Sequence, residues 1–347
     1  MIPNKNELFE STRRALGLSP DAQFTVTPIV QGGSDRFFYR FHTRSHPSFI
    51  VLLYNDQKKE NSLYADIARF LKKLNIQVPL IFEHDERNKI IWMEDVGQSD
   101  LYSIRDEDWI IRREFYRKAL KQVNILHHKG LPLARKTDLI TLPSFNVGLY
   151  EWEHHYFLEN LINAYFEIEL NEHEAMKLGE ELGRLEERLM QTPTCLIHRD
   201  FQSQNIMLSD DSTYLIDFQG IRGGSAYYDL GSLLYDPYVD FKHKERIDLL
   251  EYYYDQLRHD PITSIPTWEN FLLSFYEASA QRLMQALGAY GFLGLKKHKA
   301  EYLSYIKQGL INLLDCTYYS GNLQHLQKLS TKLLELESQR RKNLRKT

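Results

Sequence analysis

The chain has little of several features that mark special classes of protein. Its 347 residues include only two cysteines, Cys195 and Cys316, so no disulfide framework is expected. No apolar run approaches the roughly 18 residues that a membrane-spanning helix needs. The opening segment lacks the apolar core of a signal peptide. These absences exclude a disulfide-rich secreted fold and a membrane protein, and we expect a cytoplasmic location.

The chain also has little net charge. The 43 basic and 47 acidic residues leave a formal net charge of −4, which gives no basic footprint for nucleic acid. Histidines number 13, but no Cys/His cluster has the spacing of a zinc site. We therefore expect neither nucleic acid nor zinc as a partner, and no segment indicates an obligate protein partner.

The chain does have the length and apolar content for a large core. Hydrophobic residues make up 43% of the positions, an ordinary share for a globular protein, and 347 residues favour two lobes over one compact domain. The sequence changes character near residues 94–98. We predict an α+β fold with an N-terminal lobe over residues 1–95 and a C-terminal lobe over residues 96–347.

Helix and strand patterns alternate in the first lobe. Apolar residues at helical spacing predict helices over 4–17 and 60–74. Segments rich in β-branched and aromatic residues predict strands over 25–30, 37–43 and 48–54, and two more strands around the turn at 85–88. The small lobe is therefore predicted to be a five-stranded antiparallel sheet with one helix before it and one within it.

The second lobe has an almost wholly helical pattern. An apolar stripe predicts a helix over 108–129, which Gly130 and Pro132 are expected to end. Further helices are predicted over 172–190 and in several segments from residue 244 onward. The one clear interruption is LIHRDFQSQNIMLSDDSTYLIDF (196–218), where two short apolar strands flank a loop.

That interruption carries three oxygen-bearing side chains at informative intervals. Asp200 follows His198 and Arg199, Asn205 stands five residues later, and Asp217 ends an apolar strand twelve residues beyond Asn205. The first two match the H-R-D-x-x-x-x-N catalytic loop of phosphoryl-transfer enzymes. Magnesium takes hard oxygen ligands, usually one or two carboxylates together with phosphates. We predict that Asp200 is the catalytic base and that Asn205 and Asp217 hold Mg²⁺ on ATP; an unrelated turn is the alternative.

A weaker signal is QGGSD (31–35), between the first two predicted strands. Small residues let backbone N–H groups approach phosphate oxygens closely. Gly32, Gly33 and Ser34 are therefore predicted to cover the phosphates of ATP, although Gly-Gly also forms ordinary hairpin turns.

The chain resembles the aminoglycoside and choline phosphotransferases, which share the protein-kinase-like fold. Within that family it is similar to the bacterial kinases that phosphorylate N-acetylmuramate and N-acetylglucosamine on the anomeric hydroxyl in cell-wall recycling. The resemblance covers nearly the whole chain, and its motifs are GGSDRFFYRF (32–41), IIWMEDVG (90–97), HRDFQSQN (198–205), LIDFQ (215–219) and AQRLMQALG (280–288). It implies a two-lobe fold, with a small antiparallel-sheet lobe and a mostly helical lobe. It also implies an ATP-dependent kinase whose acceptor is a small molecule, namely an amino sugar.

The resemblance implies roles for individual residues as well. Met93, Glu94 and Val96 match the hinge whose backbone meets adenine. Asp229 matches the helix Asp that holds the catalytic loop from behind, and His198 is assigned to structural support with it.

Three residues are candidates for contacts with the acceptor. Glu153 stands at a position that is acidic in the similar sugar kinases and is predicted to accept sugar hydroxyls; a carboxylate on a helix surface is the alternative. Arg222 and Arg282 are candidates for binding a phosphate or an anionic group, with a structural ion pair as the alternative for Arg282.

The chain also departs from the kinase pattern. The predicted third strand, SFIVLLYND (48–56), lacks the lysine that the kinase template aims at the phosphates. Arg36 or Arg40, on the neighbouring strand, is predicted to supply that charge. Only eleven residues separate Asp217 from Asp229, which leaves no room for a long regulatory loop, so protein-kinase activity is not expected.

Two further departures concern the acceptor. Gln285 and Gly220 stand where the similar sugar kinases tend to carry Lys and Asp. The sequence leaves two alternatives open: an aminoglycoside- or choline-type phosphotransferase, and a catalytically weak nucleotide-binding protein that regulates a partner.

Overall fold

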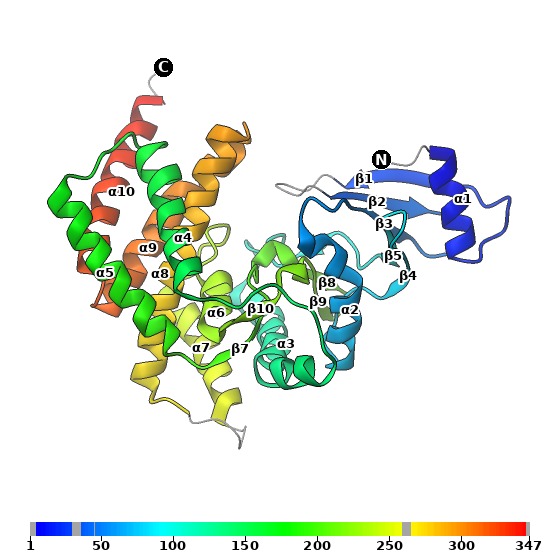
Figure 1. Cartoon of the computed structure of the whole chain (residues 1–347), viewed down its shortest axis with the longest axis horizontal. Coiled ribbons are helices and arrows are strands. Elements are labelled where there is room, and N and C mark those ends of the chain that lie inside the picture. Colours follow the sequence, from blue (N-terminus) through cyan, green and yellow to red (C-terminus); the bar gives the residue numbers. More distant parts are fainter. Residues whose placement is uncertain (1–4, 30–35, 45, 259–264, 345–347) are drawn as a thin grey trace.

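The computed structural model describes residues 5–29, 36–44, 46–258 and 265–344, and its sheet and most of its helices form separate parts (Figure 1). The sheet has five antiparallel strands in the order β1-β2-β3-β5-β4. Its strands are β1 (Thr25–Ile29), β2 (Phe37–His42), β3 (Phe49–Leu53), β4 (Ile81–Asp85) and β5 (Ile90–Glu94). All five predicted strands are confirmed, with ends that shift by a residue or so.

Helices cover both faces of this sheet because β3 is apolar on both sides. Val51 and Leu53 belong to a cluster with Leu8 of α1 (Lys5–Ala15), whereas Ile50 and Leu52 belong to the main core together with α2 (Tyr64–Lys73). The alternation follows from the two-residue repeat of a strand. Both predicted helices are confirmed; the second begins as a 3₁₀ turn, η1 (Lys59–Leu63).

The rest of the chain is mainly helical, and the α+β class is confirmed. Its α-helices are α3 (Trp109–Lys136), α4 (Val147–Phe157), α5 (Glu172–Met190), α6 (Ala226–Leu234), α7 (His243–Arg258), α8 (Trp268–Gly291), α9 (Ile306–Ser320) and α10 (Gln324–Leu344). Shorter helical segments are η2 (Leu158–Asn163), η3 (Ser203–Asn205), η4 (Phe218–Gly220), η5 (Phe292–Lys296) and η6 (Ala300–Tyr305).

The predicted end of α3 is wrong. The helix continues through Gly130 and Pro132 to Lys136. A Cβ atom at Gly130 would lie 3.0 Å from the Cβ of Leu196, so this glycine provides close packing and not a helix end. Pro132 removes one backbone hydrogen bond from the helix. The packing of α3 against neighbouring elements offsets the free-energy cost of that loss.

Two small sheets frame the predicted catalytic loop. β7 (Thr194–Ile197) pairs with β10 (Arg222–Ser225), and β8 (Ile206–Ser209) pairs with β9 (Ser212–Leu215) and β6 (Ser99–Asp100). The sequence predicted β7 and β9, which belong to different sheets, but not their partners. The loop from β7 to β8 and the loop from β9 to β10 lie together, because the Ile216 N–H donates to the Asn205 carbonyl (3.0 Å).

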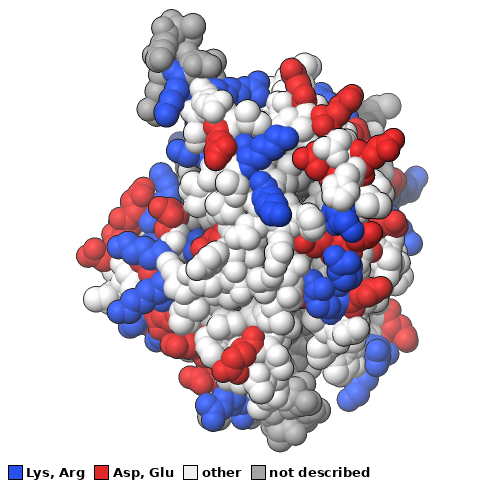
Figure 2. Space-filling view, turned by 90° about the vertical axis from the view of Figure 1, so that its left-hand side faces the viewer, with Lys and Arg blue, Asp and Glu red and all other residues white. Residues whose placement is uncertain are grey.

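The connection between the two parts is short. β5 ends at Glu94, and β6 already pairs with β8 of the helical part. The predicted lobe boundary at residue 95 lies in this connection and stays a prediction. Among the described helices, none has an apolar stretch able to fill the hydrocarbon layer of a membrane. On the face in Figure 2, basic and acidic side chains are interspersed; the expectation that nucleic acid is not a partner remains untested.

Candidate active site

Asp200 lies on a loop that a buried carboxylate holds in place. Asp229 of α6 is fully buried and accepts hydrogen bonds from the backbone N–H groups of His198 and Arg199, both at 2.7 Å. The His127 Nε2 atom lies 3.0 Å from the same carboxylate. Arg199 has a left-handed backbone (φ 77°), an unfavourable conformation for a residue with a Cβ. Asp229 therefore stabilises a strained segment immediately before Asp200.

His198 is also fully buried. Its ring lies 5.8 Å from the ring of Phe201, and neither of its ring nitrogens has a hydrogen-bond partner among the described residues. Packing is thus the visible role of this side chain.

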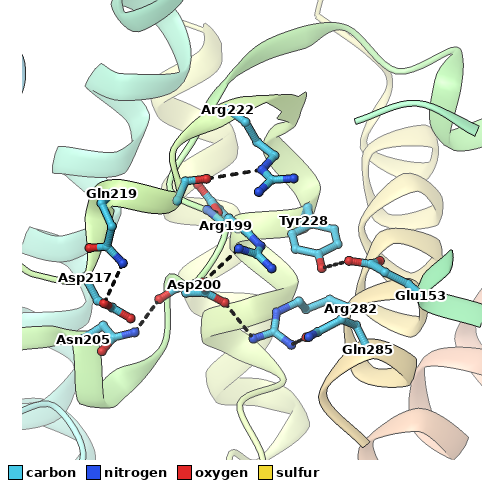
Figure 3. A network of polar contacts seen from close by, with 12 residues as sticks. Glu153, Arg199, Asp200, Asn205, Asp217, Gln219, Arg222, Tyr228, Arg282 and Gln285 are labelled. Carbon is cyan, nitrogen blue, oxygen red and sulfur yellow. Dashed lines mark hydrogen bonds and ion pairs between the residues drawn. The ribbon is translucent and has the colours of Figure 1, made fainter. Parts of the chain in front are cut away.

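Asn205 and Asp217 lie together on one side of Asp200 (Figure 3). The Asn205 Nδ2 atom donates to the carbonyl oxygen of Asp200 (2.9 Å), so its own amide oxygen points elsewhere. Asp217 also has a left-handed backbone, with φ 60° and ψ 32°. Its Oδ1 atom accepts hydrogen bonds from Arg36 and from Gln219 Nε2, which leaves Oδ2 for another ligand.

The carboxyl group of Asp217 is held in its ionised form. Burial by itself raises its pKa, but the nearby Arg36 charge and the hydrogen bonds from Arg36 and Gln219 outweigh burial and lower the pKa. Beside it, the buried Gln219 Oε1 atom has no donor within the described part of the chain. An ionised carboxylate and amide oxygens are the donor types that Mg²⁺ takes, so these residues fit the predicted ion.

The two candidate arginines of β2 and its approach point to different places. Arg36 pairs with Asp217, as described above. Arg40 instead donates to both carboxylate oxygens of Asp95 (2.7 and 3.0 Å) and to the Gly97 carbonyl (2.8 Å). Arg36 therefore lies at the candidate metal site, whereas Arg40 ties the sheet to the connection between the two parts.

The predicted hinge lies at the end of β5. Met93 is buried and its sulfur accepts from the Tyr64 hydroxyl (3.6 Å), while the backbone N–H of Glu94 donates to the Leu80 carbonyl (2.8 Å). Val96 is buried next to them. Gly32, Gly33 and Ser34, predicted to cover the phosphates, lie outside the described residues.

Arginines lie on the side of Asp200 away from Asp217 (Figure 3). The Arg282 Nη2 atom is 3.6 Å from Asp200 Oδ1, and the Arg199 Nη1 atom is 3.9 Å from Asp200 Oδ2. Arg222 donates to the Gly220 carbonyl (3.3 Å). Burial, followed by the nearby Arg199 charge, lowers the pKa of Arg222. The acid thus faces a cation site on one side and a group of arginines on the other.

Arg282 has hydrogen-bonding capacity to spare. Its Nη1 atom donates to Gln285 Oε1 (2.6 Å), but its buried Nε atom has no acceptor within the described residues. Its guanidinium carbon lies 5.9 Å from the centre of the Tyr228 ring. This side of Asp200 therefore offers donors and positive charge to a bound molecule.

Comparison with known proteins identifies the family of this chain. A model of the phosphotransferase enzyme family matches residues 25–262, which is more than half of the chain. The chain belongs to the phosphotransferase enzyme family. Its assignment as an enzyme, a small-molecule kinase, is thereby confirmed.

Curated relatives of this phosphotransferase include two bacterial sugar kinases. The N-acetylmuramate/N-acetylglucosamine kinase of Pseudomonas aeruginosa is 22% identical over 289 residues, which cover 80% of this chain and 79% of that protein. The kinase of the same name from Neisseria meningitidis is 22% identical over 299 residues, which cover 82% and 83%.

Solved structures of the family share its fold. A choline/ethanolamine kinase family protein from Mesorhizobium loti has a TM-score of 0.61 at 14% identity, covering 92% of this chain and 99% of that chain. An ADP-bound aminoglycoside phosphotransferase has a TM-score of 0.54 at 13% identity, covering 91% and 99%. The predicted protein-kinase-like fold is confirmed.

Glu153 of this phosphotransferase is buried, so the alternative of a surface carboxylate is wrong. Only 2% of the residue is exposed. Its Oε1 atom accepts from the Tyr228 hydroxyl (2.8 Å) and its Oε2 atom from Gln281 Nε2 (2.9 Å). Burial raises its pKa. Both oxygens are already engaged, and a direct contact with a sugar hydroxyl stays a prediction.

The sequence did not identify Gln219 and Asp236 as parts of the site. Gln219 follows Asp217 by two residues and turns back to bond it. Asp236 accepts from Ser203 on the catalytic loop. The available signal was weak: Asp236 stands seven residues after Asp229, but it lies two residues beyond the end of α6, so helical spacing alone could not place it beside the catalytic loop.

Proposed function

We propose that this phosphotransferase transfers the γ-phosphoryl group of ATP to the anomeric hydroxyl of an N-acetylated amino sugar, such as N-acetylmuramate or N-acetylglucosamine. The observation that carries the proposal is the position of Asp200 between the Asn205–Asp217 pair and the arginine side. The names of the curated relatives support the choice of acceptor. We place the reaction in the cytoplasm, which the two unpaired cysteines favour, and in cell-wall recycling, which the resemblance of the sequence to the sugar kinases implies.

Asp200 would accept the proton of the attacking hydroxyl. An anomeric hydroxyl is more acidic than an ordinary alcohol, so a single carboxylate suffices as the base. Asn205 and Asp217 would hold Mg²⁺, which neutralises charge on the phosphates. Arg36 would stabilise the transferring group in place of the absent lysine. Gly32, Gly33 and Ser34 would cover the phosphates, and the backbone of Met93, Glu94 and Val96 would meet adenine.

The charge on the acceptor side supports a neutral or anionic sugar over a cation. Arg199, Arg222 and Arg282 lie on that side of Asp200 (Figure 3), and burial raises the pKa of Glu153, which lies there too. A polycationic aminoglycoside or the quaternary ammonium group of choline would meet repulsion there. The regulatory alternative is disfavoured because Asp200, Asn205 and Asp217 are all present.

The test is incubation with magnesium–ATP and either N-acetylmuramate or N-acetylglucosamine, followed by phosphorus NMR. A sugar 1-phosphate is the expected product. The 1-O-methyl glycoside of N-acetylglucosamine is the matched control, because it has no free anomeric hydroxyl and should not react. Phosphate on the 6-hydroxyl, or turnover only with an aminoglycoside or choline, would contradict the proposal.

A further inference from the structure

Two carboxylates seven residues apart hold opposite ends of the catalytic loop. Asp229, within α6, accepts the N–H groups of His198 and Arg199 just before Asp200. Asp236, two residues beyond the end of α6, accepts from the backbone N–H (2.8 Å) and the hydroxyl (2.6 Å) of Ser203. The loop that carries Asp200 is thus fixed at both ends to one stretch of chain.

Ser203 is the point at which the loop turns toward Asn205. It is fully buried and begins the 3₁₀ turn η3, in which the Asn205 N–H donates to the Gln202 carbonyl (3.0 Å). The side chain of Asn205 then reaches back to the Asp200 carbonyl (2.9 Å). Ser203 therefore lies in the short segment that joins Asp200 to Asn205.

The buried position of Asp236 is unfavourable for a carboxylate. Only 1% of the residue is exposed, and its other oxygen accepts the Tyr238 N–H (3.0 Å). Burial raises its pKa to about 6 in spite of these hydrogen bonds. A buried carboxyl group is unfavourable unless hydrogen bonds compensate it, and here most of the compensation comes from the catalytic loop.

We propose that Asp236 is a positioning residue for phosphoryl transfer, which acts through Ser203 to fix the separation between Asp200 and Asn205. The inference rests on the proposed roles of Asp200 as base and Asn205 as metal ligand. Asp236 itself does not touch the acceptor or ATP. Its loss should therefore impair the chemical step more than nucleotide binding.

The variants are Asp236→Ala, Ser203→Ala and the double substitution. Asp236→Ala should lower kcat between about 10- and 100-fold, because small misplacements of reacting groups are costly, with the KM for ATP within about twofold of wild type. The double variant should be no slower than Asp236→Ala alone, since both changes break one link. Glu337→Gln is the control: Glu337 is equally buried and accepts from Tyr165 and Arg341, and its replacement should leave kcat unchanged.

A second readout does not depend on the acceptor. Amide hydrogen exchange of residues 198–205 should speed up in Asp236→Ala and stay unchanged in Glu337→Gln. If the wild-type enzyme phosphorylates no amino sugar, the proposed function fails, but exchange and turnover with its actual acceptor still test Asp236. A folded Asp236→Ala variant with native kcat and native exchange would overturn the inference. Should Asp236→Ala not fold, Ser203→Ala decides, with a loss of about threefold or more in kcat supporting the link and native kcat overturning it.

Discussion

Arg36 and Asp217, which are 181 residues apart in the chain, form an ion pair between the sheet part and the catalytic part. Arg36 stands immediately before β2, and Asp217 follows β9. The N-terminal part thus contributes a positive charge directly beside the candidate metal ligand. This charge comes from the residue before β2 and not from β3, where the kinase template places its lysine and where the residues are apolar here.

Replacing Arg36 should remove a donor from the transferring phosphoryl group. We expect Arg36→Ala to lower kcat by a factor on the order of 10²–10³, which is the usual effect of losing one preorganised donor. Arg40→Ala is the matched comparison. Arg40 donates to Asp95 and to the Gly97 carbonyl, so its replacement should mainly raise the KM for ATP. Steady-state kinetics of both variants check this; equal losses of kcat would show that the two arginines do not differ in role.

The pH dependence of Arg36→Ala should change as well. In the native protein Arg36 lowers the pKa of Asp217 against the effect of burial. Without Arg36 the raising effect of burial is less opposed, so the carboxyl should bind a proton at higher pH and lose its metal as pH falls. We expect the acid limb of the kcat/KM profile for magnesium–ATP to move to higher pH. An acid limb unmoved from that of the wild type would contradict the assignment of Asp217 to the metal.

Asp200 and Asp217 should fail in different ways. Asp200→Asn should abolish most turnover but leave magnesium–ATP binding largely intact, because a base acts on the acceptor. Asp217→Asn should weaken nucleotide binding as well as turnover. Calorimetric titration with magnesium–ATP, alongside kinetics, separates the two. Equal loss of ATP affinity in both variants would refute these separate roles.

Arg282 is expected to serve the acceptor. Its Nη2 atom faces Asp200 and its Nε atom is buried without an acceptor among the described residues. Arg282→Gln should raise the KM for the acceptor about 10- to 100-fold, the range of a charged hydrogen bond, with the KM for ATP unchanged. Arg188→Gln is a control, since Arg188 pairs with Glu277 instead. A purely structural Arg282 would instead leave the acceptor KM unaltered and lower only the melting temperature.

Glu153 should matter to stability before anything else. Glu153→Ala would remove the acceptor of the Tyr228 hydroxyl and one of the two acceptors of the Gln281 amide, at about 1–3 kcal/mol for an unsatisfied buried group. The neighbouring, exposed Glu151→Ala should cost little. Denaturant unfolding compares the two. A loss no larger than that of Glu151→Ala would mean that these hydrogen bonds contribute nothing measurable.

The parts of the site that the sequence revealed are local. Asp200, Asn205 and Asp217 stand within one 18-residue stretch, so their spacing alone indicated the chemistry. The sequence could not choose between Arg36 and Arg40. Arg36 stands just before β2 and Arg40 lies within it, so only the tertiary structure shows which side chain reaches Asp217. Asp236 was missed for the same reason: its partner Ser203 is 33 residues away.

Errors in the fold had local causes too. Gly223 and Gly224 give β10 little strand propensity, yet they allow its close approach to Ser144 and Ile197. Gly130 and Pro132 resemble a helix end, but tertiary packing carries α3 past them. Long apolar periodicities were reliable, whereas glycine served packing in places where a turn was the local expectation.

The left-handed backbone at Arg199 and Asp217 lowers the thermal stability of the protein at positions that serve its catalysis. Such a conformation costs about 1–2 kcal/mol for a residue with a side chain, more than the roughly 0.5–1 kcal/mol of extra chain entropy that glycine loses on folding. Glycine at Asp217 would lose this gain, because it would also break the ion pair with the buried Arg36 side chain. Glycine at Arg199, whose side chain makes only a 3.9 Å ion pair with Asp200, would keep the gain and make the chain more heat-resistant and less active. A screen for thermostability alone would enrich such inactive variants, and directed evolution of this enzyme should select for turnover in the same round.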